Sequence, residues 1–326
     1  MKRHTKKIPF ATALIMIGLY VGLAWFFSGM IISPPSRGGG PENESRGEGR
    51  DRKRSSEIDI AHLGEPERVR IRSGDITLAG SYFENSADCE CGVILLPGRG
   101  GRRSGSLRFA PLYWSLGCDV LAYDLRGAGD SSPGYQTFGY YDKEDASAAV
   151  DWLSDRSGIT PFQVGIMGSS YGSAVALQTL SKRSDLAFVI ADSTFSSLES
   201  VVTEHAVRQF GPWVKMFVPA ALFFAGVRAD FDPYAVSPAE SVAQSSTPVL
   251  LIHGADDDTT AASHSEIVYE GSNPATTVLE ITDWGPGHVS SIRHKPRAYE
   301  SIIHSFLESH VSTLELNTSH PKESVE

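Results

Sequence analysis

The pentapeptide Gly-Ser-Ser-Tyr-Gly at residues 168–172 constrains the fold of this chain most strongly. The apolar run 164–167 before it predicts a buried strand, and the stretch 171–180 after it predicts a helix. A chain that turns from strand to helix so abruptly needs glycine where backbones approach closely, and it holds the central serine in a strained conformation. Such a turn projects the Ser170 hydroxyl above a sheet, at a helix N-terminus that favours developing negative charge.

Short apolar runs alternate with helical patterns along most of the chain. Residues 69–71 and 76–83 predict an opening hairpin, and further strands are predicted at 93–96, 120–123, 164–167, 188–191, 249–252 and 278–281. Helical patterns follow most of these strands, at residues 107–116, 143–153, 171–180 and 297–307. This alternation predicts an α/β fold with a mostly parallel eight-stranded sheet and helices on both faces.

An uncharged run of 25 residues, 8–32, follows the basic residues Lys2, Arg3, Lys6 and Lys7. As a helix it is about 37 Å long, enough to cross a bilayer. It is longer than a signal-peptide core, and bulky residues such as Trp25 stand near its end where a cleavage site needs small ones. We therefore expect an uncleaved membrane anchor rather than a cleaved signal. The basic flank favours a cytoplasmic N-terminus and an exported catalytic domain.

The remaining organisation follows from composition. Residues 33–57 are rich in proline, glycine and charge, which predicts a disordered linker between the anchor (residues 1–32) and a folded domain at 58–312. Residues 313–326 are expected to form a C-terminal tail. The formal net charge of −10 argues against nucleic acid as a partner.

Three cysteines, Cys89, Cys91 and Cys118, do not form the paired C-x-x-C pattern of a structural zinc site. Cys89 and Cys91 are too close in sequence for an easy disulfide. We expect three ordinary thiols. A bridge from Cys118 to one of the other two in an oxidising compartment is the alternative.

A serine nucleophile needs a base, and the base needs a carboxylate that orients it. After a strand–turn–helix serine the expected order is serine, acid, histidine. His288 ends the sequence Gly-Pro-Gly-His in a loop after the last predicted strand, which suits a mobile base. His294 is the second candidate, and His253, at the end of a buried strand, is expected to be structural.

The acid should follow the predicted strand 249–252. Asp257 fits best within His-Gly-Ala-Asp-Asp-Asp at 253–258, while Asp256 or Asp258 could instead cap the turn. Asp192, one strand earlier, is a rarer alternative. The backbone N–H groups of Tyr171 and of Arg99, in the loop Pro-Gly-Arg-Gly-Gly at 97–101, are the predicted oxyanion donors.

Five motifs in order resemble the α/β-hydrolase superfamily, and more closely its serine-aminopeptidase-like and dienelactone-hydrolase-like branch, which includes bacterial hydrolases with one N-terminal membrane helix. They are Leu-Leu-Pro-Gly at 95–98, Asp-Leu-Arg-Gly-Ala-Gly-Asp-Ser at 124–131, the pentapeptide 168–172, His-Gly-Ala-Asp-Asp at 253–257 and Gly-His at 287–288. The resemblance covers roughly residues 69–307. Relatives usually have His-Gly where this chain has Pro97-Gly98, so we expect an oxyanion loop of a different shape.

The resemblance implies that residues 124–131 are structural and that the insertion at about 196–245 forms a helical cap. The apolar stretch 214–227 within it either packs onto the domain or forms an acyl pocket or membrane-facing lid. Arg99, Arg102, Arg103 and Arg108 crowd the presumed pocket mouth, as a solvated surface or as a site for an anionic head group.

The expected activity is hydrolysis of an acyl ester, a small molecule or a lipid-like substrate, through a covalent acyl-serine. This chemistry requires no metal and no organic cofactor. An aminopeptidase-like serine peptidase and an acyltransferase would use the same triad, and a non-catalytic binding protein with this fold is a further alternative.

Overall fold

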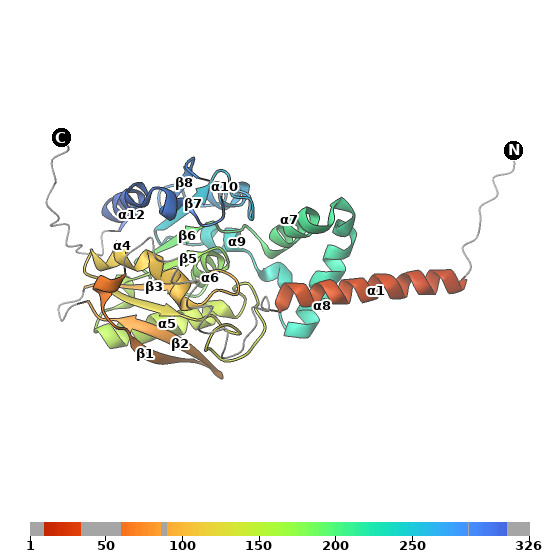
Figure 1. Cartoon of the computed structure of the whole chain (residues 1–326), viewed down its shortest axis with the longest axis horizontal. Helices are drawn as coiled ribbons and strands as arrows, with labels where there is room; N and C mark the ends of the chain where they lie inside the picture. Colours follow the sequence, from red (N-terminus) through yellow and green to blue (C-terminus); the bar gives the residue numbers. More distant parts are fainter. Residues whose placement is uncertain (1–9, 34–59, 86–89, 286, 312–326) are drawn as a thin grey trace.

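The computed structural model of the chain describes residues 10–33, 60–85, 90–285 and 287–311 (Figure 1). Its centre is one eight-stranded sheet in the order β1-β2-β4-β3-β5-β6-β7-β8. β1 and β2 are antiparallel to their neighbours, and every pair from β4 to β8 is parallel. The predicted α/β fold with a mostly parallel eight-stranded sheet is therefore confirmed.

The strands match the predicted apolar runs to within a few residues. Their bounds are β1 Glu67–Ser73, β2 Ile76–Phe83, β3 Gly92–Leu96, β4 Asp119–Tyr123, β5 Val164–Ser169, β6 Phe188–Asp192, β7 Val249–Gly254 and β8 Thr277–Thr282. The five strands β3 to β7 are buried along their whole length, as strands covered on both faces must be.

Alternate residues of the central strands β3 to β7 face two separate cores. On one face, Ile94 and Ile166 pack with α5 (Asp142–Ser157) and α6 (Tyr171–Thr179). On the other face, Val93 and Leu250 pack with α4 (Ala110–Trp114) and α12 (Pro296–His310). The short elements between them are η1 Ala61–Leu63, α3 Arg103–Ser106, η2 Leu107–Phe109, η3 Pro161–Gln163, α10 Ser263–Glu270 and α11 Ser291–His294.

The segment between β6 and β7 is helical. It contains α7 (Leu198–Phe210), the 3₁₀ helix η4 (Pro212–Phe217), α8 (Val218–Ala229), η5 (Pro233–Ala235) and α9 (Pro238–Ala243). We call α7, η4 and α8 the cap. Figure 1 shows α7 and α8 standing away from the sheet, beside α1.

The N-terminal helix α1 (Phe10–Ile32) packs along α8 of the cap and extends past it (Figure 1). Residues 11–32 of α1 are long and apolar enough to cross a membrane, a property that a signal sequence shares. The predicted linker after Ser33 and the predicted C-terminal tail lie outside the described residues.

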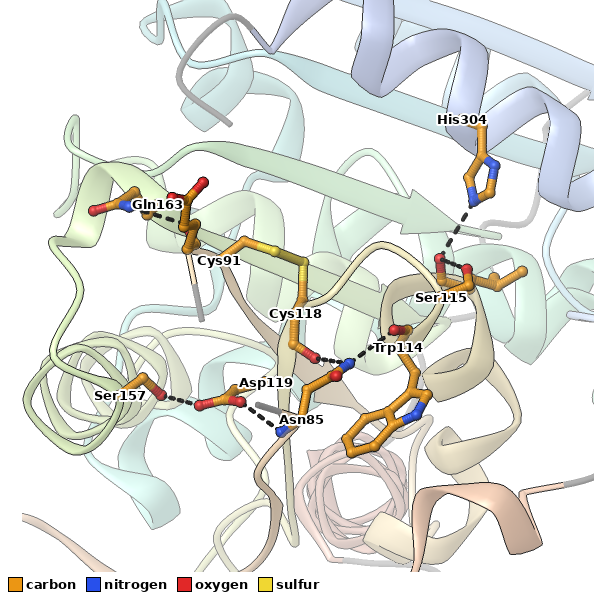
Figure 2. The surroundings of a disulfide bond; sticks show 11 residues. Asn85, Cys91, Trp114, Ser115, Cys118, Asp119, Ser157, Gln163 and His304 are labelled. Atoms are coloured by element: carbon orange, nitrogen blue, oxygen red, sulfur yellow. Dashed lines mark hydrogen bonds between the residues drawn. A yellow bond between two sulfur atoms is a disulfide. The ribbon is translucent and has the colours of Figure 1, made fainter. Parts of the chain in front are cut away.

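Cys91 and Cys118 form a disulfide, which corrects the expectation of three ordinary thiols (Figure 2). Cys91 comes just before β3 and Cys118 just before β4, and these strands pair in parallel with Gly92 opposite Asp119. The pairing brings the two Cα atoms to 4.6 Å. The bridge lies at the amino ends of the strands, so it cannot contact residues that follow their carboxyl ends.

Candidate active site

The turn between β5 and α6 is as tight as the pentapeptide predicts. Ser170 adopts φ 54° and ψ −118°, a conformation that is strained for a residue with a side chain. A Cβ on Gly168 would lie 2.2 Å from the carbonyl oxygen of Gly172, and a Cβ on Gly172 would lie 2.6 Å from the carbonyl oxygen of Leu96. Both positions therefore require glycine, and together they fix the place of Ser170.

Backbone hydrogen bonds hold the strained serine in place. The Ser170 N–H donates to the carbonyl oxygen of Asp192 at 2.8 Å, and the Ser170 carbonyl accepts from the N–H of Ser173 at 3.0 Å. The first bond ties the turn to the end of the neighbouring strand β6. The strain is thus offset by contacts on both sides of the serine.

His288 lies in the loop that follows β8, as predicted. Its Nδ1 is 2.7 Å from Oδ2 of Asp257, while its Nε2 is buried and has no hydrogen-bond partner among the described residues. His288 and Ser170 line the same cavity. The hydrogen bond from Nδ1 leaves Nε2 as the nitrogen available to accept a proton. Contacts between nucleophile and base often tighten only when substrate binds.

Asp257 lies in the loop after β7 and is held by four partners. Its Oδ1 accepts from the N–H groups of Thr259 at 2.9 Å and Thr260 at 3.0 Å, and its Oδ2 also lies 3.4 Å from Nε2 of His253. Burial raises the pKa of the Asp257 carboxyl, but the hydrogen bonds from His253 and His288 outweigh burial and hold that pKa well below its usual range. Asp257 is therefore ionised beside His288.

The alternative candidates meet other partners. The Asp192 carboxylate accepts from Tyr299 Oη at 2.8 Å and Ser193 Oγ at 2.9 Å, and burial raises its pKa. His253 is fully buried, with Nδ1 2.7 Å from Ser265 Oγ and Nε2 2.9 Å from the carbonyl oxygen of Thr260. His294 packs against Gly285.

The predicted oxyanion donors lie on two sides of Ser170. Tyr171 is the first residue of α6, where the helix provides no acceptor for its N–H. The loop after β3 approaches closely, because a Cβ on Gly98 would lie 3.4 Å from the Cβ of Ser170. Neither the Tyr171 nor the Arg99 N–H donates a hydrogen bond to the part of the chain that the structure describes.

Ser170 and His288 open into a cavity of about 550 Å³, a size typical of small-molecule sites. The cap contributes most of its apolar wall, through Val201, Val202, Phe210, Val214, Phe217 and Val218. Arginines supply the charge, namely Arg99, Arg102, Arg108 and Arg293. No aspartate or glutamate occurs among the described residues that line it.

Two features of this cavity were not predicted. Arg103 does not line it, because its guanidinium pairs with the buried Asp124 and with Asp130. Phe27, Met30 and Ile31 of α1 do line it, although α1 is more than a hundred residues from Ser170 in sequence. The apolar pattern of α1 is uniform, so the sequence carries no signal for which of its residues contact the domain.

Residues 106–312, more than half of the chain, match the prolyl oligopeptidase family. The chain belongs to the prolyl oligopeptidase family. The matched segment of this family member contains Ser170, Asp257 and His288. Among relatives by sequence, the uncharacterised protein YqkD of Bacillus subtilis is 30% identical over 206 residues, which are 63% of this chain and 67% of YqkD. The chain thus aligns with about two thirds of that relative.

Solved structures agree with this family. An esterase of Pyrococcus furiosus, Pf2001, superposes with a TM-score of 0.64 and 25% identity over 86% of this chain and 98% of the esterase. An acylaminoacyl peptidase of Pyrococcus horikoshii superposes with a TM-score of 0.58 and 18% identity over 80% of this chain and 43% of the peptidase. This member of the prolyl oligopeptidase family is thus an α/β-fold serine hydrolase, in agreement with the resemblance to α/β-hydrolases.

Proposed function

We propose that the chain hydrolyses acyl esters through a covalent acyl-serine, with Ser170, Asp257 and His288 as its triad. His288 Nε2 takes the proton of the Ser170 hydroxyl as Oγ attacks the ester carbonyl, while Asp257 orients the imidazole through Nδ1. The N–H groups of Tyr171 and Arg99 stabilise the oxyanion. The leaving alcohol takes the proton from His288.

The second half of the cycle uses the same residues. His288 removes a proton from water, the resulting hydroxide attacks the acyl carbonyl, and Ser170 Oγ leaves with the proton that His288 returns. The acid and the alcohol are the products. An acyltransferase would differ only in the acceptor, since a second alcohol would take the place of water.

The residues that line the cavity favour an ester substrate over a peptide with a free N-terminus. Recognition of a free N-terminal amine requires a carboxylate near the bound substrate, and no acidic residue lines the described part of the cavity. Its apolar cap residues suit an acyl chain, and its arginines suit a neutral or anionic head group. A peptide with a blocked N-terminus would avoid this mismatch, so amides belong in the test.

The test of this function has two parts. A fluorophosphonate probe should label the wild-type chain and Ser169→Ala, and should not label Ser170→Ala. Wild-type kcat/KM should then be higher for acetyl, butyryl and octanoyl esters than for alanine or proline amides. Labelling of Ser170→Ala at the wild-type rate would refute the nucleophile, and higher kcat/KM for amides would favour the peptidase.

We further propose that α1 stays attached as a single membrane anchor, with the N-terminus in the cytoplasm and the catalytic domain exported. The length of α1 and the four basic residues before it support this topology. The disulfide between Cys91 and Cys118 also supports it, because such bonds persist in oxidising compartments and are rare in the cytosol.

A further inference from the structure

Residues 20–28 of α1 are joined to the cap by specific contacts. Tyr20 Oη donates a hydrogen bond of 2.8 Å to the carbonyl oxygen of Met216, and the Tyr20 ring stacks on Phe217 at 4.9 Å. Arg228 of α8 donates to the carbonyl oxygen of Trp25 at 3.1 Å and to Ser28 Oγ at 2.9 Å. These are the contacts of a packed element, and a helix that serves only as a tether has no need of them.

The end of α1 is bound to the oxyanion loop. The Arg99 guanidinium donates to the carbonyl oxygens of Met30 at 2.8 Å, Ile31 at 2.5 Å and Ser33 at 3.0 Å. The Met30 and Ile31 carbonyls belong to the last turn of α1 and the Ser33 carbonyl follows its end, where backbone acceptors have no partner within the helix. Arg99 thus caps α1 with its side chain, while its backbone N–H lies in the predicted oxyanion hole.

The same turns of α1 reach the substrate cavity. Phe27, Met30 and Ile31 line the cavity that contains Ser170 and His288. The Phe27 ring lies 5.3 Å from the ring of Phe210 in the cap. An acyl chain that extends from Ser170 under the cap would therefore meet α1 as one side of its binding site.

The length of α1 relates this wall to the membrane. The helix has 23 residues, about 35 Å, and the hydrocarbon core of a bilayer is roughly 30 Å thick. The hydrogen bond and ring contacts with the cap begin at Tyr20, so residues 10–19 provide only about 15 Å beyond them. From this position α1 crosses the hydrocarbon core only if part of the cap lies in it too.

The cap carries side chains that suit a lipid environment. η4 and α8 expose four large apolar side chains, between 53% and 62% accessible, namely Trp213, Met216, Phe223 and Val227. Lys215 beside them is long enough to place its ammonium at the lipid head groups. Tyr20 Oη and Nη1 of Arg228 both donate to backbone carbonyls, which favours their placement near lipid.

We propose that the C-terminal turns of α1 form a wall of the acyl-binding cavity, and that the enzyme takes its acyl chain from the bilayer lipids around α1 and the cap. This proposal rests on the proposed ester hydrolysis and adds the class of substrate, a membrane lipid with an ester-linked chain. In this arrangement α1 is part of the binding site, and its removal would open the cavity on one side.

The wall is tested with alkyl fluorophosphonates of increasing chain length on the full chain in phosphatidylcholine vesicles. Met30→Trp should narrow the cavity and move the fastest-labelling probe to shorter chains by about two carbons or more. Phe27→Ala should enlarge it and move that optimum to longer chains. Phe26→Trp is the matched control, because Phe26 is 61% exposed and does not line the cavity.

An unchanged optimum in both variants would refute the wall. These rates depend on an activated serine and do not depend on whether the natural bond is an ester or an amide. A wild-type chain that reacts with no probe would therefore refute the proposed function at Ser170, whereas labelling without a shift would refute only this inference.

The contact with lipid is tested independently of catalysis. An environment-sensitive fluorophore is attached to Phe223→Cys in a Cys89→Ser background, and phosphatidylcholine with a doxyl-labelled acyl chain serves as the quencher. The fluorophore at position 223 should lose at least about half of its emission when the doxyl-labelled lipid is present. Phe162→Cys is the control, because Phe162 is 54% exposed in η3, before the amino end of β5, and should not be quenched. Equal quenching at the two positions, or none at 223, would overturn the proposal.

Discussion

Asp192 ends β6 and Asp257 follows the neighbouring strand β7, and both side chains are buried, yet their carboxylates meet different partners. Asp257 is bonded to His288 and accepts two backbone N–H groups, which stabilise its charge. Asp192 is bonded to the hydroxyls of Tyr299 and Ser193, and burial raises its pKa. Only the first arrangement can orient an imidazole and stabilise its protonated form.

This difference predicts unequal effects of the same substitution. Asp257→Asn should lower kcat/KM for a butyryl ester by about 10³–10⁴, because an amide cannot stabilise the imidazolium and favours the wrong tautomer of His288. Asp192→Asn should stay within about tenfold, since an amide oxygen can still accept from Tyr299. Circular dichroism checks that both variants fold. The reverse ranking would move the acid to β6.

Among the elements, the strand–turn–helix around Ser170 has the least room for change. Gly168→Ala would place a methyl group 2.2 Å from the Gly172 carbonyl oxygen, so the turn must open. We expect the free energy of unfolding to fall by at least about 2 kcal/mol and labelling by fluorophosphonate to be lost. Gly134→Ala is the control, because no atom lies within 4 Å of its added Cβ. Equal melting temperatures for the two variants would contradict a steric role for Gly168.

His264 of α10 contacts both Ser196, shortly before α7, and Glu204, within α7. Its Nδ1 accepts from the N–H of Ser196 at 3.2 Å, and its Nε2 is 2.7 Å from Oε2 of Glu204. The bond from Ser196 requires an unprotonated Nδ1. Burial lowers the pKa of His264 and outweighs the opposite effect of Glu204, so the neutral ring is the form that the fold favours.

The sign of the pH dependence follows from this shift. Because the folded pKa of His264 lies below the unfolded value of about 6.5, the unfolded state binds more protons below that pH. The contribution to stability is complete above about pH 6.5 and is lost as the pH falls through the folded pKa. His264→Asn keeps an acceptor near Ser196 and cannot titrate. Its melting temperature should therefore fall less than that of the wild type between pH 7 and pH 5, and an equal fall would contradict this role.

At the scale of elements, the sequence was sufficient wherever periodicity or a motif determines structure. Strand–helix alternation predicted the sheet. The expected order of serine, acid and histidine selected residues that all follow the carboxyl ends of strands in the structure. The docking of α1 had no such signal, because every face of that helix is apolar. The side chain of Arg99 was likewise not predictable, since its partners are backbone carbonyls of a helix 66 to 69 residues away in sequence.

At the scale of the whole molecule, the cavity, the disulfide and α1 occupy three different places around the sheet. The cavity lies at the carboxyl ends of the strands, and the disulfide joins the amino ends of β3 and β4. Helix α1 extends from the domain beside α8 of the cap (Figure 1). The disulfide joins residues 27 apart, and removing such a bridge usually costs about 2–4 kcal/mol. An exported domain gains this stabilisation, whereas the same chain in a reducing cytosol does not.

The state of the cysteines in cells therefore reports the topology of the whole chain. The sequence contains Cys89, Cys91 and Cys118, so an exported chain with the Cys91–Cys118 bridge offers one thiol after denaturation without reductant, and three after reduction. In a gel-shift assay with a polymer-linked maleimide, we expect one adduct without reductant and three with it. Cys118→Ser should give two adducts in both conditions and should inactivate at a lower temperature, because it loses the constraint on the unfolded chain. The cells are quenched with acid before the assay. Three adducts from the wild type without reductant would show that the bridge does not form, and the disulfide would then no longer support an exported domain.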